Sequence, residues 1–207
     1  ECVQLFENIF TSVSAPIADN LVDTLLMPKL SKAVQQWNPT TDVVPIHTWI
    51  HPWLPLLKSK LSSMFPEIRR KFGTALARWQ PSDTSALAVL EPWITVFDRT
   101  SMENFLVRNI VPKLVAALRE LQIDPKNQYL APIGWVLAWK DILPRFHLVS
   151  LFEGEFFPRW LQTLHTWLLH NPDLQEITTW YMGWKSQFPA DLQEDERLLA
   201  QFNRALE

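Results

Sequence analysis

The stretch FPEIRRKFGTALARWQPSD, residues 65–83, contains the pattern that decides the fold of this chain. Its apolar side chains recur at spacings of three and four residues, which places them on one face of a helix. They are Phe65, Ile68, Phe72, Leu76 and Trp79. Pro66 suits the first turn of this helix, because the amides there have no intrahelical acceptor. Pro81 disfavours helical geometry in the residue before it, and Ser82 and Asp83 can cap a following helix, so the stretch predicts a helix, a tight turn and a second helix.

The same pattern recurs along the chain. Prolines equivalent to Pro66 stand at Pro28, Pro112 and Pro158, so that successive prolines are 38, 46 and 46 residues apart. Their apolar stripes are Leu26, Leu30, Val34 and Trp37, then Val111, Leu114, Val115, Leu118 and Leu121, and finally Phe157, Trp160, Leu161, Leu164 and Leu168. The second helix of each repeat contains a tryptophan 12 or 14 residues after the proline of the turn. These tryptophans are Trp53, Trp93, Trp139 and Trp184, after Pro39, Pro81, Pro125 and Pro172.

A repeat of this length is typical of HEAT or armadillo-like helical hairpins. We therefore predict an all-α chain that forms one domain over residues 1–207, a solenoid of about four helical-hairpin repeats. The predicted repeats cover roughly residues 16–58, 62–98, 101–143 and 146–188. Thr100 with Glu103 has the spacing of a capping box and predicts the start of the third repeat.

The last part of the chain predicts one more helix, over residues 193–206, which would cap the array. Its apolar face consists of Leu198, Leu199, Phe202 and Leu206.

The composition bounds the possible functions of this 207-residue chain. It has 4 glycines, where average usage of about 7% predicts roughly three times as many, which disfavours β-turns and glycine-rich phosphate loops. A formal net charge of -3 lacks the basic excess of a nucleic-acid-binding domain. The single cysteine, Cys2, excludes an internal disulfide and a cysteine-rich zinc site, so a reducing compartment fits best.

The hydropathy pattern predicts no membrane association, because no apolar run approaches the ~20 residues that span a bilayer. The first ten residues, ECVQLFENIF, carry no basic segment or cleavage pattern, and the chain does not begin with methionine. We expect it to be a fragment of a larger soluble protein.

The stretch WIHPWLP, residues 49–55, contains the densest cluster of aromatic and proline residues. Trp53 falls at the repeated tryptophan position, so packing between helices is the simplest interpretation for it and for Trp93, Trp139 and Trp184. The alternative is that these residues and Trp49 are anchors for a partner, because tryptophan is enriched among interface hot spots.

Catalytic and metal-binding patterns are weak. His47 and His51 have the i, i+4 spacing of two ligands on a helix, but no glutamate lies between them as in HExxH, and Pro52 distorts the helix there. Acidic pairs such as Glu153 with Glu155 are typical of solvated faces. Asp191 with Glu194, and the isolated histidines His147, His165 and His170, likewise suggest no site. We predict no catalytic site, no metal and no cofactor.

The densest basic cluster lies between residues 58 and 71. It consists of Lys58, Lys60, Arg69, Arg70 and Lys71, with Glu67 as the one acid. Such a cluster can contact RNA phosphates or an acidic protein surface, and the alternative is an ordinary solvated face.

Four longer strings carry a family resemblance. They are VVPIHTWIHPWLPLL at 43–57, NIVPKL at 109–114, FFPRWLQTLHTWL at 156–168 and EITTWYMGWKSQF at 176–188. From about Val43 to Leu206, the sequence resembles the GC-rich-sequence DNA-binding-factor-like domain of G-patch proteins that act in spliceosome disassembly.

The resemblance implies a nuclear protein of the late spliceosome. Members of this family recruit a DEAH-box RNA helicase through a G-patch that lies N-terminal to the domain, and the sequence here contains no G-patch. The resemblance implies a non-catalytic scaffold whose partners are spliceosomal proteins and a second protein with the same domain type. DNA binding finds little support in the charge, and RNA binding through the 58–71 cluster is the alternative.

Overall fold

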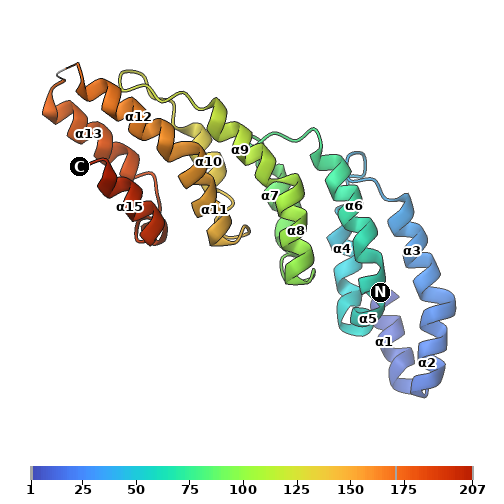
Figure 1. Cartoon of the computed structure of the whole chain (residues 1–207). Helices are drawn as coiled ribbons and strands as arrows, with labels where there is room; N and C mark the ends of the chain where they lie inside the picture. The colour runs from blue at the N-terminus through green and yellow to red at the C-terminus, as the bar shows by residue number, and fades with distance from the viewer. Residues whose placement is uncertain (1, 171, 207) are drawn as a thin grey trace. The chain divides into compact units, whose positions relative to one another are not determined.

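The computed structural model describes residues 2–170 and 172–206, except for the side chains of residues 2, 10 and 58. Every element in that part of the chain is helical, and it contains no strand, so the prediction of an all-α chain is confirmed (Figure 1). The chain divides into two compact units. Unit 1 consists of Glu1–Trp79 and Ala88–Asp98, and unit 2 consists of Gln80–Leu87 and Arg99–Glu207. The single domain and the four repeat boundaries predicted above stay predictions.

Unit 1 contains two long helical runs joined by the turn at residues 37–45. The first run is α2 (Ala15–Leu21), the π-helical η1 (Val22–Leu26) and α3 (Met27–Gln36), preceded by α1 (Cys2–Ser12). The second run is α4 (Ile46–Ile50), η2 (His51–Trp53), α5 (Leu54–Leu61), η3 (Ser62–Met64) and α6 (Phe65–Leu76). The short helices α7 (Ser85–Leu90) and η4 (Glu91–Trp93) come next in the chain.

Unit 2 repeats this alternation of long runs and turns. Its first part is α8 (Arg99–Asn109), α9 (Val111–Glu120) and α10 (Ala131–Leu137). A continuous run follows, made of α11 (Arg145–Leu151), the π-helical η5 (Phe152–Phe156) and α12 (Phe157–Leu168). The last elements are α13 (Leu174–Lys185), α14 (Ala190–Gln193) and α15 (Glu196–Arg204).

The repeated prolines lie inside these long runs, at the point where the helix changes its hydrogen bonding. An α-helix begins around each proline as predicted, but the residues before it are helical too, which the sequence did not predict. Inside a helix, proline lacks an amide and its ring clashes with the carbonyl four residues earlier. The π-helical turns η1 and η5 precede Pro28 and Pro158, a 3-10 turn precedes Pro66, and Ile110 interrupts the helix before Pro112.

The two π-helical turns have the same arrangement of side chains. In each, the first and last residues are buried, and an acidic residue stands five positions before the proline. Asp23 forms an ion pair of 2.8 Å with Lys60 of α5. Glu153 forms an ion pair with Arg197 of α15. In each case, the acidic side chain of the π turn binds a cation of a later helix in its own unit, α5 in unit 1 and α15 in unit 2.

Unit 1 packs around Trp93, whose side chain is fully buried. Its indole stacks on Phe97 at 4.7 Å and meets the rings of Phe72 and His51 edge-on, at 5.8 and 4.7 Å between centroids. All residues of the first two predicted stripes are buried, so these stripes are confirmed.

Unit 2 packs around a second aromatic cluster, in which Trp160 stacks on Trp180 at 5.4 Å and on Phe156 at 6.2 Å. Of the fourth stripe, Phe157, Trp160 and Leu164 are buried. The prediction was wrong for two of its leucines: Leu161 is only half-buried, and Leu168, the last residue of α12, is 43% exposed. In the third stripe, Val111 and Val115 are half-buried.

Two predicted helix starts are also wrong. α8 begins at Arg99, so Thr100 lies inside the helix, and Glu103 pairs with His147 at 3.1 Å in place of closing a capping box. The terminal helix begins at Glu196, because Asp195 accepts a hydrogen bond from the amide of Arg197 as an N-cap. Its buried face consists of Leu198 and Phe202, whereas Leu199 and Leu206 are exposed.

Replacement of Trp93 by alanine is expected to lower the free energy of unfolding by about 3–5 kcal/mol, because it leaves a cavity in the centre of unit 1. Urea unfolding followed by circular dichroism measures this loss. Val43, which is 95% exposed, supplies the control, because Val43→Ala should change the stability by less than about 0.5 kcal/mol. Equal stability of Trp93→Ala and the wild type would contradict the aromatic core.

Candidate interaction surfaces

The tryptophans singled out from the sequence are mostly inside the protein. Trp53, Trp93, Trp139 and Trp184 are buried, and Trp49 is half-buried. Trp53 packs edge-on against Phe6 at 5.6 Å, and Trp184 lies 5.1 Å from Phe156. A buried indole offers little surface to a partner, so the exposed surface of each unit is made mainly by other residues.

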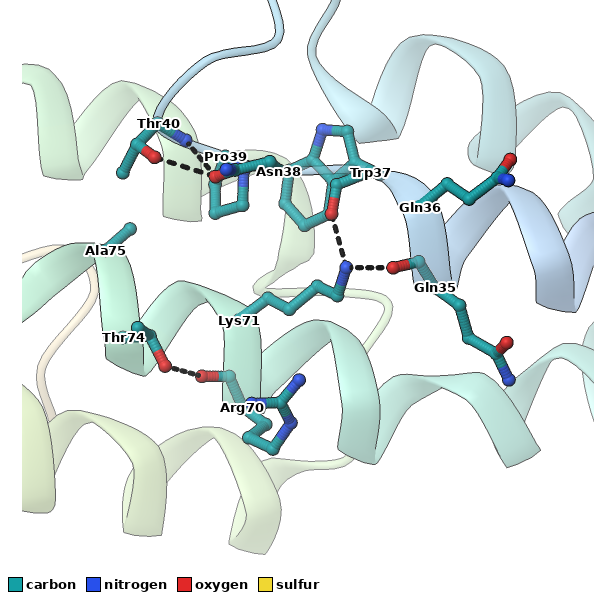
Figure 2. Close-up of a pocket in the computed structure, with 10 residues that line it drawn as sticks. All are labelled: Gln35, Gln36, Trp37, Asn38, Pro39, Thr40, Arg70, Lys71, Thr74 and Ala75. Atoms are coloured by element: carbon teal, nitrogen blue, oxygen red, sulfur yellow. Dashed lines mark hydrogen bonds between the residues drawn. The ribbon is translucent and has the colours of Figure 1, made fainter.

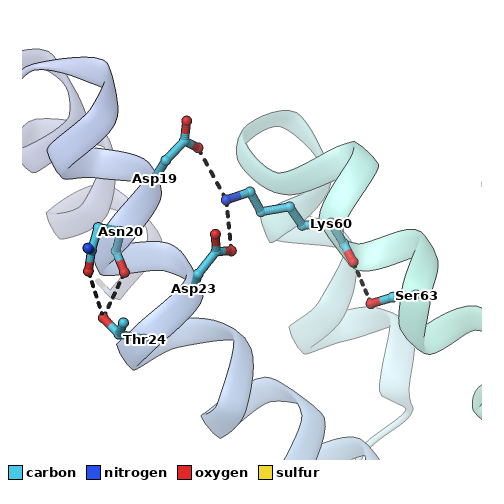
Figure 3. A network of polar contacts seen from close by, with 6 residues as sticks. All are labelled: Asp19, Asn20, Asp23, Thr24, Lys60 and Ser63. Atoms are coloured by element: carbon cyan, nitrogen blue, oxygen red, sulfur yellow. Dashed lines mark hydrogen bonds and ion pairs between the residues drawn. The ribbon is translucent and has the colours of Figure 1, made fainter.

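The basic cluster is engaged within unit 1. Lys60 binds both Asp19 and Asp23, at 3.2 and 2.8 Å (Figure 3). Arg70 donates two hydrogen bonds to Glu67, at 2.8 and 2.7 Å, and these bonds lower the pKa of the Glu67 carboxyl. The side chain of Lys58 lies outside the described residues.

The other two cations of the cluster have structural contacts as well. The guanidinium of Arg69 lies 5.0 Å from the centre of the Phe97 ring, within the range of a cation–π interaction. The ammonium of Lys71 donates hydrogen bonds to the carbonyls of Gln35, at 2.6 Å, and of Trp37 (Figure 2). Each of the four described cations thus has its own partners within the unit, and the four do not form one free phosphate-binding patch.

Lys71 has a counterpart in unit 2. Helix ends leave carbonyl groups without intrahelical donors, and cations stabilise this end of the helix dipole. Lys71 of α6 satisfies carbonyls at the end of α3. Arg159 of α12 satisfies carbonyls at the end of α9, with hydrogen bonds of 2.7 Å to Leu118 and 2.8 Å to Arg119. In each unit, a long helix therefore holds the end of an earlier long helix.

The histidine pair His47 and His51 is half-buried at the edge of the core of unit 1. The two rings lie 5.7 Å apart, and the Nε2 atom of His51 is buried with no hydrogen-bond partner among the described residues. Burial, and secondly repulsion from His47, lower the pKa of His51 below its ordinary value of 6.5. The part of the chain that the structure describes contains no group of three or more potential metal ligands.

Of the acidic residues noted in the sequence, Glu153 and Glu155 each form an ion pair with an arginine. Glu155 accepts two hydrogen bonds of 2.7 Å from Arg119, which lower the pKa of its carboxyl, and Glu153 binds Arg197. The backbone carbonyl of Asp191 accepts a hydrogen bond from Arg145. These contacts join neighbouring helices of unit 2.

Two surface grooves occupy equivalent positions in the two units. The Lys71 groove, of about 420 Å³, lies between the turn at residues 38–40 and α6 (Figure 2). The Trp167 groove, of about 390 Å³, lies between the turn at residues 124–126 and α12. Both grooves are lined by the residues at positions 4, 5, 8 and 9 after the proline near the start of the helix, which is Pro66 in α6 and Pro158 in α12. These are Arg70, Lys71, Thr74 and Ala75 in unit 1, and Gln162, Thr163, Thr166 and Trp167 in unit 2.

A second pair of grooves lies beside α3 in unit 1 and beside α12 in unit 2. The Met27 groove, of about 560 Å³, lies between α3 and the residues around Met64, and the Leu161 groove, of about 480 Å³, lies between α12 and α15. Each groove is lined by the proline near the start of its helix, Pro28 in α3 or Pro158 in α12, and by the residues at positions 3, 6 and 7 after that proline. These are Pro28, Ser31, Val34 and Gln35 in unit 1, and Pro158, Leu161, Leu164 and His165 in unit 2.

No helix among the described residues has the length and apolar character needed to cross a membrane. The structure thus defines an all-helical protein in which aromatic cores are buried, charges are paired between helices, and surface grooves recur at fixed positions.

The chain belongs to the family of GC-rich sequence DNA-binding factor-like proteins, whose sequence profile matches residues 1–164. This confirms the resemblance found in the sequence. The chain is 48% identical over 191 residues, or 92% of its length, to tuftelin-interacting protein 11 from Gallus gallus, Homo sapiens and Xenopus laevis. It spans 23% of the length of these relatives. Neither the family nor these relatives bear the name of an enzyme.

Replacement of Lys71 by methionine is expected to lower the free energy of unfolding by about 1–3 kcal/mol, because the carbonyls of Gln35 and Trp37 lose a charged donor. Methionine keeps most of the aliphatic chain, so the change isolates the ammonium group. Urea unfolding measures the loss. Lys32→Met, at an exposed position of α3, should leave the stability unchanged, and equal effects of the two variants would contradict the role of Lys71.

The lowered pKa of His51 predicts a loss of stability in acid. Because the folded state disfavours the protonated ring, the unfolded chain binds more protons as the pH falls through 6.5, and unfolding is favoured until the folded-state pKa is also passed. Melting temperatures should therefore fall between about pH 8 and about pH 5. His51→Gln should flatten this dependence, whereas His165→Gln, at an exposed position, should keep it. An unchanged pH dependence in His51→Gln would contradict the assignment.

Proposed function

We propose that this chain is a non-catalytic protein–protein interaction scaffold in pre-mRNA splicing. The observation that carries the proposal is the recurrence of two kinds of surface groove at the same positions after the helix proline in both units. Recurring grooves on successive helices are the means by which repeat proteins bind extended partners.

The same recurrence supports the finer proposal for the fold, a helical-hairpin repeat of the HEAT or armadillo class. Proline position, buried stripe, carbonyl-binding cation and grooves all recur together. The position of α15 supports the predicted role of the last helix as a cap. α15 forms one wall of the Leu161 groove, just as the residues around Met64 form one wall of the Met27 groove.

The splicing context of the proposal rests on the sequence resemblance and on the membership of the family. The resemblance extends to domains of G-patch proteins that act in spliceosome disassembly. The proposed role is to anchor such a helicase activator to the late, intron-lariat spliceosome in the nucleus. The partners are then spliceosomal proteins and a second protein with the same domain type, while the DEAH-box helicase binds the G-patch outside this chain.

The engaged cations favour protein partners over nucleic acid. An RNA-binding site needs several cations free to meet consecutive phosphates. The four described cations of the 58–71 cluster instead bind Asp19 and Asp23, Glu67, Phe97 and backbone carbonyls. We therefore retain RNA binding only as an outcome of the test.

The proposal predicts that the immobilised chain retains spliceosomal proteins from a nuclear extract, and that these proteins persist after nuclease treatment. Mass spectrometry of the retained proteins, with and without nuclease, measures this. Beads that carry the heat-unfolded chain are the control for adhesion to exposed apolar side chains.

Loss of every specific protein on nuclease treatment would assign binding to RNA and refute the scaffold. Retention of the same proteins by the unfolded chain would show that the folded surface plays no part.

A further inference from the structure

The helix α12 exposes an apolar face that no other described element covers completely. Leu161 is half-buried, Leu168 is 43% exposed and the next residue, Leu169, is 70% exposed. Leu161 and Leu168 line the Leu161 groove together with Pro158 and Leu164 of the same helix, and α15 forms the opposite wall. The groove of about 480 Å³ is thus mainly apolar on the side of α12.

The second feature of this groove is the charge of the residues that line it. Among the described residues of its lining, Arg204 is the one with a permanent charge, and none is a carboxylate. α12 itself contains no aspartate or glutamate. Arg204 is exposed and forms no ion pair with another described residue. In this it differs from Arg70, Arg119, Arg145 and Arg197, each of which binds a carboxylate.

The equivalent Met27 groove of unit 1 shows that these features are not imposed by the fold. Where α12 has Leu161 and His165, α3 has Ser31 and Gln35. The charges of the Met27 groove are those of Asp23 and Glu67, which already bind Lys60 and Arg70. The apolar face, and an arginine that pairs with no described carboxylate, are therefore specific to the Leu161 groove.

We propose that the Leu161 groove binds an acidic amphipathic segment of a partner protein. Apolar side chains of the segment pack on Leu161 and Leu168, and one of its carboxylates pairs with Arg204. Positions 161, 165 and 168 lie on one helix face at spacings of four and three, which suits the apolar row of an amphipathic helix laid in the groove. The inference rests on the proposed function in one respect, that the chain acts by binding other proteins.

The charge complementarity decides between occupants. A basic segment would place its cations beside Arg204, with no carboxylate of the lining to receive them. A nucleic-acid strand would meet one permanent cation in the groove and an apolar floor, whereas phosphate recognition needs several cations. An arginine at the edge of an apolar pocket is a frequent hot spot for a carboxylate-bearing partner.

The test uses the whole 207-residue chain and a defined probe. Random peptides of about twelve residues displayed on phage are selected on the immobilised chain, and the affinities of enriched peptides are measured by fluorescence anisotropy. The variants are Arg204→Glu and Leu168→Glu. Their matched controls in unit 1 are Arg78→Glu, at an exposed arginine, and Leu25→Glu, at a helical leucine that is 52% exposed. Thermal melts check that all four variants fold.

We expect enriched peptides to combine bulky apolar residues with aspartate or glutamate. Their affinity should fall by about tenfold or more in Arg204→Glu and Leu168→Glu and remain unchanged in both controls. Exchange of the peptide carboxylate for lysine should restore binding to Arg204→Glu, which identifies the pair directly.

Four results would overturn the inference. They are the absence of any enriched peptide that depends on Arg204 and Leu168, enrichment of basic peptides at this groove, saturable binding of an oligouridylate that Arg204→Glu abolishes, and a sedimenting dimer that Leu168→Glu dissociates. Failure here is distinct from failure of the scaffold. If Leu168→Glu retains the full set of nuclease-resistant spliceosomal proteins, the scaffold stands and this groove is not its contact site.

Discussion

The missing amide of proline is the constraint on which the rest of this structure depends. Each long helical run carries a proline where the helix cannot continue with unchanged hydrogen bonds. At Pro28 and Pro158 the chain forms a π-helical turn, from which Asp23 and Glu153 bind cations of later helices in their own units. The stripe after each proline is then turned towards the aromatic core of its unit. The same effect of proline on helix hydrogen bonding, repeated along the chain, thus determines both the packing of the helices and the contacts between them.

Several charged residues join helices, and this shapes the functional interpretation. Lys71 and Arg159 bind carbonyls at the ends of earlier helices, and Lys60, Arg119 and Arg197 bind carboxylates across helix pairs. The four described cations of the 58–71 cluster already have partners within unit 1 and are therefore poorly suited to bind a polyanion. The proposed function assigns partner binding to the grooves beside the proline-bearing helices instead.

Much of the fold was predictable because helical periodicity is local. The first two apolar stripes, the α-helix that begins around each proline and the family follow from short spacings and specific strings. The two errors at helix starts had different causes, a tertiary partner in one case and a local cap closer to the helix in the other. Glu103 pairs with His147 instead of capping its own helix, and Asp195 caps the last helix ahead of the predicted apolar face. Leu161 and Leu168 share spacings with buried residues, yet the sequence does not show where the core ends.

The sequence by itself determined the helical class, the repeated proline pattern and the family, because these depend on residues close together in the chain. It also pointed to the tryptophans and to the 58–71 cluster, but not to their surroundings. Only the tertiary structure decided that most of these indoles are buried, that the four described cations of the cluster are engaged, and that Arg204, beside Leu161 and Leu168, forms no ion pair with another described residue. Burial and pairing depend on helices more than thirty residues apart in sequence, which local spacing does not encode.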